Sequence, residues 1–356
     1  MVTADLTIRD GRLSGVRLRG DFFLHPADAS TAVLEALTAA LEGMPADASA
    51  PALAAHIRAA IHFGVELLGT SPEAMAAAIR RAVTGDPDAD APAEERIGQF
   101  AAAEIDALTE RWKNLPWRLL PETPLSAAMN VALDEVLTAP TLRFWKWTEQ
   151  AVIIGRCQSV ANEVDAVAAA EAGVTVVRRS TGGGAMFLQP HGAITYSLYL
   201  PEALLAGLTI RQSYEVCEAW LVRGLRELGV DAHHVPINDI ACAEGKIGGA
   251  AQSRRQGLVL HHTTLAYDMD PGDMVRVLRI GREKLRDKAV ASAQKRVSPL
   301  VRQTGLSRED IVAHLFAAFQ RRFGGTVDAL SAAELAAAEA LVRTKYGHAD
   351  WTQAFA

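Results

Sequence analysis

The stretch RRSTGGGAMFLQPHGAI, residues 178–194, contains two arginines and three consecutive glycines between two apolar segments. VTVV precedes it and AITYSLYL follows it, and both are typical of β-strands, so the stretch is predicted to connect strand to strand. A Walker loop needs GxxxxGK[ST] between a strand and a helix, and a dinucleotide fingerprint needs GxGxxG at the start of a helix. Neither pattern is present, so the fold is not predicted to be a standard nucleotide-binding α/β fold.

The glycines and arginines of this loop nevertheless suit an anionic ligand. Gly182, Gly183 and Gly184 allow the backbone to lie directly against a ligand, with N–H groups turned toward its oxygens. Arg178 and Arg179 would add positive charge for a carboxylate or phosphate. Because strand residues alternate in direction, we expect only one of the two arginines to face the site. A plain flexible turn is the alternative.

A second stretch, PINDIACAEGKIGGAAQSRRQGLVLHHTTL at residues 236–265, carries further polar groups beside glycines. Asp239 lies within eight residues of Lys246, a spacing that suits a metal–nucleotide or an acyl phosphate. The ammonium of Lys246 would neutralise oxygens that gain charge in phosphoryl or adenylyl transfer, and Asp239 would hold Mg²⁺. The alternative is a β-hairpin that turns at residues 243–245 and exposes the lysine.

Composition narrows the class of protein. The chain has 356 residues, 49% of them hydrophobic, and a formal net charge of −6 without a long basic run, which disfavours a nucleic-acid-binding role. No apolar run reaches the ~18 residues of a membrane span, and the start lacks a secretory signal. The three cysteines form no C-x-x-C pair. We therefore expect a cytoplasmic protein with no membrane partner.

The order of the predicted elements indicates two parts. The first combines a hairpin around Asp10-Gly11 with helices near 30–43, 53–63 and 71–83. The acidic, Pro-bearing stretch 85–95 is interpreted as a domain linker, with a long surface loop as the alternative. The second part is richer in strands, and its helices are spaced irregularly among them. This pattern predicts an α+β fold.

Five stretches in order resemble motifs of the lipoate–protein ligase family, and one of them, residues 236–265, holds three of the motifs. RRSTGGGAM resembles the family's RRxSGGGAV, and NDI, GKIGGAAQ and HHTTL resemble its NDI, GKKISGSAQ and HHGTL. Residues 116–137, 152–165 and 345–351 resemble its opening helix with NMAxDE, its GRxQ…E segment and its closing KYxSxxW. The resemblance covers essentially all of residues 112–356.

The N-terminal part also resembles a known unit. Residues 10–37, DGRLSGVRLRGDFFLHPADASTAVLEAL, are similar to the small accessory domain of bipartite lipoate ligases. The two resemblances imply an accessory α/β domain at 1–84, a linker and connecting helix at 85–111, and a catalytic domain at 112–356. The catalytic fold implied is of the biotin/lipoate-ligase type, a mixed sheet with helices related to the class II aminoacyl-tRNA synthetases.

The resemblance implies an ATP-dependent ligase that works in two steps. Lipoate, or octanoate, attacks the α-phosphate of Mg-ATP to give an acyl-AMP, and a carrier lysine then takes the acyl group. ATP and Mg²⁺ are the implied cofactors and lipoate the substrate. The implied partner is an apo lipoyl carrier: a 2-oxoacid dehydrogenase acyltransferase subunit, a glycine-cleavage H protein or a dedicated lipoyl-binding protein. Such chemistry needs positioning and shielding from water more than a nucleophilic side chain.

The family's functional residues carry over one by one. Lys246 is the implied catalytic lysine, which contacts carboxylate and α-phosphate oxygens, and Asp239 is the implied Mg²⁺ ligand. The residues implied to bind substrate or ATP are Arg178, Arg179, Thr181, Gly182, Gly183, Gly184, Ala185, Asn238, Asp239, Gly249 and Gln252.

The chain departs from the family pattern at three places. Leu188-Gln189 stand where the family has His-Asp after the glycine loop, and His191 is a possible substitute or a turn residue. Gly248 replaces a serine, and HHGT becomes HHTT. These changes suggest an altered preference for the acyl group or the acceptor.

Three other functions remain open. Octanoyl transfer from acyl carrier protein through a cysteine thioester would need an activated thiolate near Lys246, and Cys242 lies four residues before it. A biotin ligase would share the fold but not RRSTGGGA. A non-catalytic lipoyl-carrier-binding homologue would not need Lys246.

The pairs His233-His234 and His261-His262 match no common zinc spacing.

Overall fold

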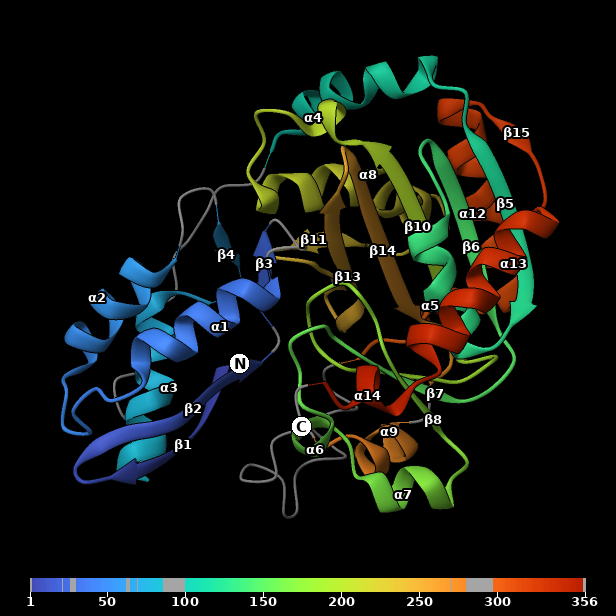
Figure 1. Ribbon diagram of the computed structural model, residues 1–356. Coiled ribbons are helices and arrows are strands. Elements are labelled where there is room, and N and C mark those ends of the chain that lie inside the picture. Colours follow the sequence, from blue (N-terminus) through green and yellow to red (C-terminus); the bar gives the residue numbers. More distant parts are fainter. Residues whose placement is uncertain are drawn as a thin grey trace.

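The computed structural model describes residues 2–20, 22–25, 30–61, 65–68, 70–85, 100–269, 271–279 and 297–354. Its centre is an eight-stranded mixed sheet in the order β11-β12-β13-β14-β10-β6-β5-β15 (Figure 1). Apart from Gly85, the predicted linker 85–95 lies outside the described residues. The predicted α+β class is confirmed by this combination of a large mixed sheet with helices.

The central strand of the sheet is β10 (Ala193–Pro201), the strand predicted after the glycine loop. It pairs antiparallel with both neighbours, and all of its residues but Pro201 are buried, which accounts for its continuous apolar and aromatic sequence. The other strands are β5 (Arg118–Leu125), β6 (Thr141–Trp147), β11 (His233–Val235), β12 (Asp239–Cys242), β13 (Gly245–Arg255), β14 (Leu258–Ala266) and β15 (Thr326–Val327).

Helices cover both faces of this sheet (Figure 1). One face packs against α8 (Ile210–Glu227) and α12 (Arg308–Phe323) in a core that includes Trp220 and Phe319. The opposite face packs against α5 (Ala127–Val136) and α13 (Ala332–Leu341) around Leu133 and Leu260. Residues of β14 alternate between these two environments because successive side chains of a strand point to opposite faces.

A three-stranded sheet of order β8-β7-β9 carries the glycine loop. Its strands are β7 (Ala151–Ile154), β8 (Thr175–Arg178) and β9 (Met186–Leu188), and the loop runs from the end of β8 to the start of β9. The strand-to-strand placement predicted for the loop is therefore confirmed. Shorter helices flank this region and the chain ends: α4 (Ala102–Thr109), η2 (Glu110–Asn114), α6 (Val160–Glu163), α7 (Ala166–Glu171), η3 (Glu202–Leu205), α9 (Pro271–Val277), α11 (Leu300–Thr304), η5 (Val342–Tyr346) and α14 (Ala349–Thr352).

The N-terminal residues form a separate core. β1 (Val2–Arg9) and β2 (Arg12–Gly20) make a hairpin whose turn residues, Asp10 and Gly11, both have positive φ. The remaining elements of this part are β3 (Phe23–His25), β4 (Glu66–Leu68), α1 (Ser30–Leu41), α2 (Ala50–Ala60) and α3 (Pro72–Thr84). Cys157, from the loop after β7, is buried in this N-terminal core. The domain limits 1–84, 85–111 and 112–356 remain a prediction.

Among the described residues, no helix combines the length and apolar character that a membrane crossing requires.

Helix α13, in the C-terminal part of the chain, is fixed to the sheet by an ion-pair cluster around Arg118. Arg118 of β5 contacts Glu334 of α13, and its Nε donates to Asp328 at 2.6 Å. The pairing with Arg118 lowers the pKa of Glu334 from 4.5 to about 2. Because this pKa is lowered in the folded state, the ion pair stabilises the fold fully above about pH 4.5, and this stabilisation is lost as the pH falls toward 2.

We expect Glu334→Gln to lower the free energy of unfolding at pH 7 by about 1–3 kcal/mol, discounted for partial exposure. The variant should also show less dependence of stability on pH between 4.5 and 2, measured by urea denaturation. The control is Glu339→Gln, an exposed residue of the same helix, which should change little. Equal effects of the two substitutions would contradict this account.

Candidate active site

The glycine loop is held against the segment after β7 by a contact that permits no side chain. A Cβ on Gly155 would lie 1.9 Å from the carbonyl oxygen of Gly183, so only glycine fits there. The backbone N–H of Arg156 donates to the carbonyl of Thr181 at 2.8 Å, and that of Arg179 donates to Ile154 at 3.0 Å. These contacts fix the path of the loop.

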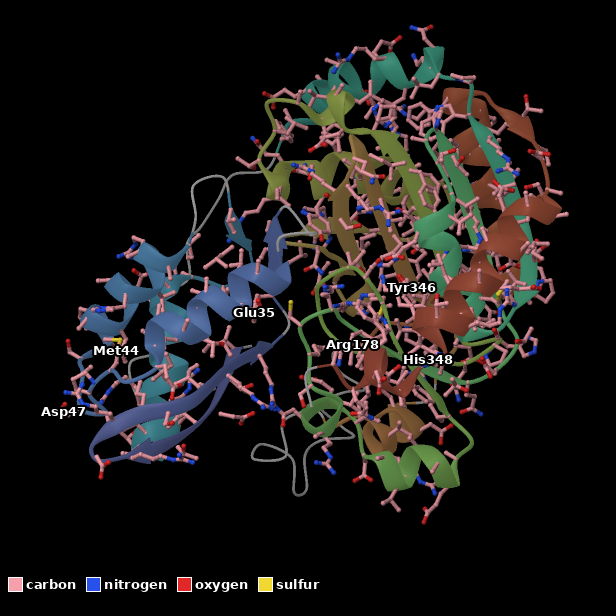
Figure 2. All side chains as sticks on the ribbon, in the orientation of Figure 1. Glu35, Met44, Asp47, Arg178, Tyr346 and His348 are labelled. Carbon is pink, nitrogen blue, oxygen red and sulfur yellow. The ribbon has the colours of Figure 1, made fainter. Side chains whose placement is uncertain are left out.

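Arg178 organises the backbone around the loop. Its buried guanidinium donates to the carbonyl oxygens of Gly155, Arg156 and Gln158 at 3.0, 2.9 and 2.6 Å, and to Thr352 at 2.7 Å. Figure 2 shows Arg178 beside the C-terminal segment that carries Tyr346 and His348. Arg178 therefore joins the loop after β7 to the C-terminal end, and it does not line the main cavity described below.

Arg179, by contrast, lines that cavity. It is 3% exposed, and it donates to Gly184 O at 2.9 Å and from Nε to Thr181 Oγ1 at 3.0 Å. Burial lowers the pKa of Arg179 to about 10, so it stays protonated near neutral pH. No carboxylate of the described residues forms an ion pair with it. A buried cation without an acidic partner favours a ligand atom that carries or gains negative charge.

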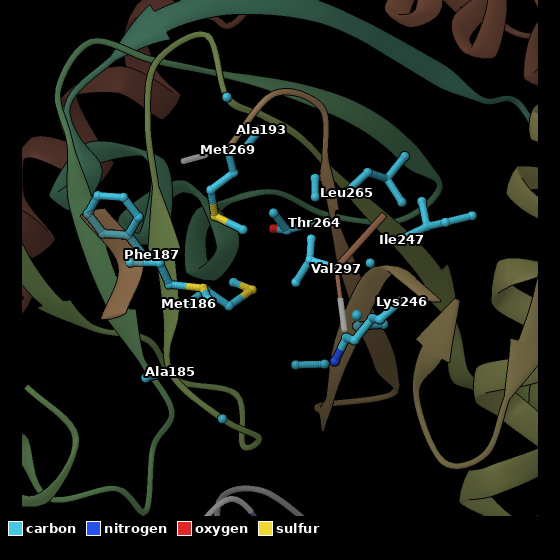
Figure 3. Close-up of a pocket in the computed structure, with 18 of the residues that line it drawn as sticks. Ala185, Met186, Phe187, Ala193, Lys246, Ile247, Thr264, Leu265, Met269 and Val297 are labelled. Carbon is cyan, nitrogen blue, oxygen red and sulfur yellow. The ribbon is translucent and has the colours of Figure 1, made fainter. Parts of the chain in front are cut away.

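The cavity has a volume of about 250 Å³ and lies between the glycine loop with β9 and the strands β13 and β14. Figure 3 shows Lys246 on one side, its Nζ directed into the cavity, and Met186 and Phe187 on the other. Most of the wall is apolar; its larger side chains are Met186, Phe187, Ile247, Leu265, Met269, Met274, Leu278 and Val297. The cavity thus joins an apolar interior to two cationic groups, Lys246 and Arg179.

Lys246 is oriented by Asp239. The two residues come from neighbouring strands, β13 and β12, and Nζ lies 2.6 Å from Asp239 Oδ1. A Cβ on Gly249 would lie 3.2 Å from Nζ, so the glycine leaves room for the lysine side chain. The predicted pair Asp239–Lys246 is brought together, as an ion pair whose carboxylate faces the ammonium. No cluster of three metal-ligating side chains occurs among the described residues.

The other predicted residues are placed in different environments. Gly184, Ala185, Asn238 and Gly249 line the cavity together with Arg179 and Lys246. Thr181, Gly182 and Gly183 lie in the loop behind that wall, and Gln252 is directed to α8, where it accepts a hydrogen bond from Ser213. His191 is an exposed turn residue outside the cavity. Gln189, at the position of the family's Asp, donates to Asp273 of α9 at 3.1 Å.

A buried hydrogen-bond network behind the glycine loop was not predicted. Asp134 of α5 accepts hydrogen bonds from Ser197 at 2.8 Å, Tyr199 at 2.6 Å and His262 Nδ1 at 2.7 Å. Nε2 of His262 lies 2.8 Å from Thr181 Oγ1. Since Arg179 Nε donates to that oxygen, the Thr181 hydroxyl is assigned as the donor to Nε2. Asp134 and His262 lie in stretches that resemble family motifs, NMAxDE and HHGT, but the sequence alone gives no sign that they meet.

The cysteines do not approach the cavity. Cys157, Cys217 and Cys242 are the three cysteines of the chain, and all are buried. Cys242 packs with Ile240 in the core under α8, on the face of the sheet opposite Lys246. Burial raises the pKa of Cys157 to about 11 and that of Cys217 further. The thiolate that the thioester alternative requires near Lys246 is therefore not provided by Cys242 in this structure.

Residues 126–320, more than half of the chain, match the family model of the lipoyl protein ligase A/B catalytic domain. The chain belongs to this family. Among curated proteins, it is 32% identical to the octanoyltransferase LipM of Kyrpidia tusciae over 271 residues, which cover 66% of this chain and 97% of that protein.

Solved lipoate protein ligases share the fold. A bipartite lipoate protein ligase, studied with its E2 lipoyl domain from Thermoplasma acidophilum, is 29% identical with a TM-score of 0.61, covering 67% of this chain and 96% of that chain. A lipoate-protein ligase A bound with ATP is 26% identical with a TM-score of 0.59, covering 68% and 100%. The predicted biotin/lipoate-ligase type of fold and the predicted family are confirmed.

The main function predicted from the sequence is wrong. Eight curated relatives of the chain are all named octanoyltransferases, not ATP-dependent ligases. They are 27–34% identical to the chain. ATP and Mg²⁺ are not supported as cofactors by these relatives, and Asp239 is engaged by Lys246. The resemblance to lipoate–protein ligases identified the family but not the reaction. An enzyme of the lipoate ligase/transferase family is what the comparisons support.

The close approach of Gly155 to Gly183 gives a direct test of the loop's attachment. We expect Gly155→Ala to lower the free energy of unfolding by about 2–3 kcal/mol, because backbone must move to admit the methyl group. Thermal unfolding followed by calorimetry measures this loss.

The control is Gly207→Ala, where φ is +82° and no atom lies within 4 Å of the added Cβ, so backbone strain alone costs about 1 kcal/mol. A loss at Gly155 no larger than at Gly207 would show that the glycine loop is not pressed against this segment.

Proposed function

We propose that the protein transfers an octanoyl group from a thioester-linked donor to the lysine amine of a lipoyl domain. The observation that carries the proposal is the cavity beside the glycine loop, which combines apolar walls with the cationic groups of Lys246 and Arg179. The names of the curated relatives support octanoyl as the acyl group. The lipoyl domain as acceptor is supported by the similarity to the Thermoplasma acidophilum ligase that was studied with its E2 lipoyl domain.

The apolar wall suits a flexible hydrocarbon chain. Each buried methylene contributes about 0.8 kcal/mol, so the chain of an octanoyl group would supply most of the binding free energy. Met186, Met269 and Met274 form part of the wall, and unbranched, polarisable methionine side chains adapt readily to such a chain. Phe187 and Leu278 add rigid apolar surface.

The two cationic groups of the cavity suit the reacting carbonyl. When the lysine amine attacks the thioester carbon, the carbonyl oxygen gains negative charge, and fixed positive groups nearby stabilise that charge. Lys246 is held in place by Asp239, and Arg179 is held by backbone carbonyls of the glycine loop. Neither group therefore has to reorganise when the charge appears.

The transfer forms one bond and breaks one. The amine nitrogen bonds to the carbonyl carbon, the carbon–sulfur bond breaks, and the sulfur leaves as a thiol with the proton that the nitrogen loses. His262 lines the cavity and is the base that takes that proton, at the Nε2 that bonds to the Thr181 hydroxyl, before the sulfur receives it. Asp134 on Nδ1 stabilises the imidazolium in between.

We propose that the acyl group passes directly from donor to acceptor, without a covalent bond to a cysteine. The chain's three thiols are buried, and Cys242 is on the opposite face of the sheet from Lys246. Ala241 pairs with Lys246, and Cys242, the next residue of β12, points to the other face because strand residues alternate.

We expect the purified protein to add an octanoyl group to an apo-lipoyl domain from octanoyl acyl carrier protein without ATP, measured by mass spectrometry. Lys246→Met should lower kcat by about 100-fold or more, since about 2.7–4 kcal/mol is typical for a lost oxyanion-stabilising group. The matched control is Lys113→Met, an exposed lysine of η2 paired with Glu110, which should retain full activity. Modification that occurs only with ATP and free acid would overturn the proposal.

Direct transfer predicts that Cys242→Ala keeps kcat within about threefold of the unmodified protein, because the thiol packs in the core and takes no part in the reaction. The measurement is the same transfer assay, with intact-mass analysis after incubation with donor alone. An octanoyl adduct on Cys242, or loss of transfer in a variant with unchanged thermal stability, would instead establish a cysteine thioester route.

A further inference from the structure

A second cavity lies on the same face of the sheet as the first. It has a volume of about 170 Å³, and its wall includes Ser253 of β13, Leu258 and Leu260 of β14, and Asp134 of α5. Ser180 of the glycine loop also lines it. Neither the resemblance nor the comparisons give this cavity a role.

The two cavities follow one another along the strands. His262 lines the first cavity and Leu260, two residues away on β14, lines the second. On β13 the corresponding residues are Ala251, paired with His262, and Ser253, paired with Leu260. Two residues span about 7 Å of strand, and side chains two apart point to the same face. The cavities are therefore immediate neighbours.

The wall between the cavities includes the hydrogen-bonded pair His262–Asp134. His262 faces the first cavity and Asp134 faces the second, and the two are joined by the 2.7 Å hydrogen bond. A group that reached Asp134 from the second cavity would thus stand one side chain away from the cavity that holds the cationic groups.

The polarity of the second cavity matches a long chain with a cationic end. Leu258 and Leu260 offer apolar surface for methylenes, while the side chain of Asp134, only 2% exposed, offers a carboxylate at the inner end. Two arginines also line the cavity, and both have protein partners: Arg156 lies over the ring of Trp351 at 4.8 Å, and Arg255 donates to the Glu135 carbonyl at 2.8 Å. A lysine side chain has this combination of methylenes and ammonium.

We propose that the second cavity is the entrance for the acceptor lysine of the lipoyl domain. This assignment rests on the proposed acyl transfer: the acyl donor occupies the first cavity and the acceptor side chain enters from the second. Asp134 attracts the ammonium to the inner end, the ammonium releases one proton to the solvent, and the resulting amine meets the acyl carbon where the two cavities adjoin. Separate entrances allow donor and acceptor to be bound together, as a direct transfer requires.

The test is a binding experiment that needs no turnover. The apo-lipoyl domain of a 2-oxoacid dehydrogenase acyltransferase subunit is titrated into the full-length protein by calorimetry, with its acceptor lysine intact or replaced by methionine. Two cavity variants are compared with the unmodified protein: Ser253→Arg, which fills the cavity and adds a positive charge, and Ser253→Phe, which fills it without charge. The control is Ala206→Arg, in an exposed loop outside both cavities.

We expect loss of the domain's lysine to weaken binding to the unmodified protein at least fivefold. Each Ser253 variant should weaken binding of the intact domain by a similar factor. Replacing the domain's lysine by methionine should then weaken binding to these variants little further. The control should behave as the unmodified protein. The assignment would be overturned if the losses of affinity from a Ser253 variant and from the domain's methionine were additive. It would also be overturned if the two domains bound the unmodified protein equally well, or if neither bound.

A kinetic measurement separates this proposal from the proposed function. The Ser253 variants should raise KM for the lipoyl domain at least tenfold and leave KM for octanoyl acyl carrier protein within twofold. Absence of octanoyl transfer by the unmodified protein would refute the proposed function, whereas the binding comparison would still decide the entrance. Unchanged KM for the lipoyl domain in both variants would refute the entrance alone.

Discussion

The buried carboxylate of Asp134 is the group on which the arrangement of the site depends. A charge in the protein interior is tolerated only when it is fully hydrogen-bonded, and Asp134 accepts from Ser197, Tyr199 and His262. These partners come from β10 and β14, while Asp134 belongs to α5. Because its acceptors must be satisfied, the carboxylate fixes α5 to the sheet and sets the orientation of His262, which in turn contacts the glycine loop through Thr181.

The glycine loop is constrained from its other side by Arg178 and Gly155. Arg178 donates hydrogen bonds to backbone carbonyls of the preceding loop and the C-terminal segment, and Gly155 lies against Gly183. The neighbouring arginine, Arg179, is thereby left to face the cavity. Two adjacent arginines thus lie in different environments: Arg178 joins the preceding loop to the C-terminal segment, and Arg179, just beyond the end of β8, lines the cavity.

The same loop region also connects the N-terminal part to the site. Cys157 is buried among residues of the N-terminal core, and Gly20 N lies 3.5 Å from the Cys157 carbonyl. Cys157 directly follows Arg156, whose N–H bonds to Thr181. The N-terminal part therefore packs against the segment that supports the glycine loop. A short stretch of backbone connects this contact to the loop that borders the cavity.

The sequence by itself determined the α+β class, the strand-to-strand position of the glycine loop and the family, because these follow from local periodicity and from motifs kept in order. It also offered, as an alternative, a β-hairpin that turns at residues 243–245, and this hairpin is what brings Asp239 and Lys246 together. It did not determine which reaction the site performs.

The tertiary structure decided what depends on contacts distant in sequence. It placed Arg178 and Gln252 outside the main cavity, put Cys242 on the opposite face of the sheet, and joined Asp134 to His262 across 128 positions of sequence. Strand register and helix packing make these choices, and a one-residue change of register would reverse the face of every side chain in the strand. No local pattern of residues encodes that outcome.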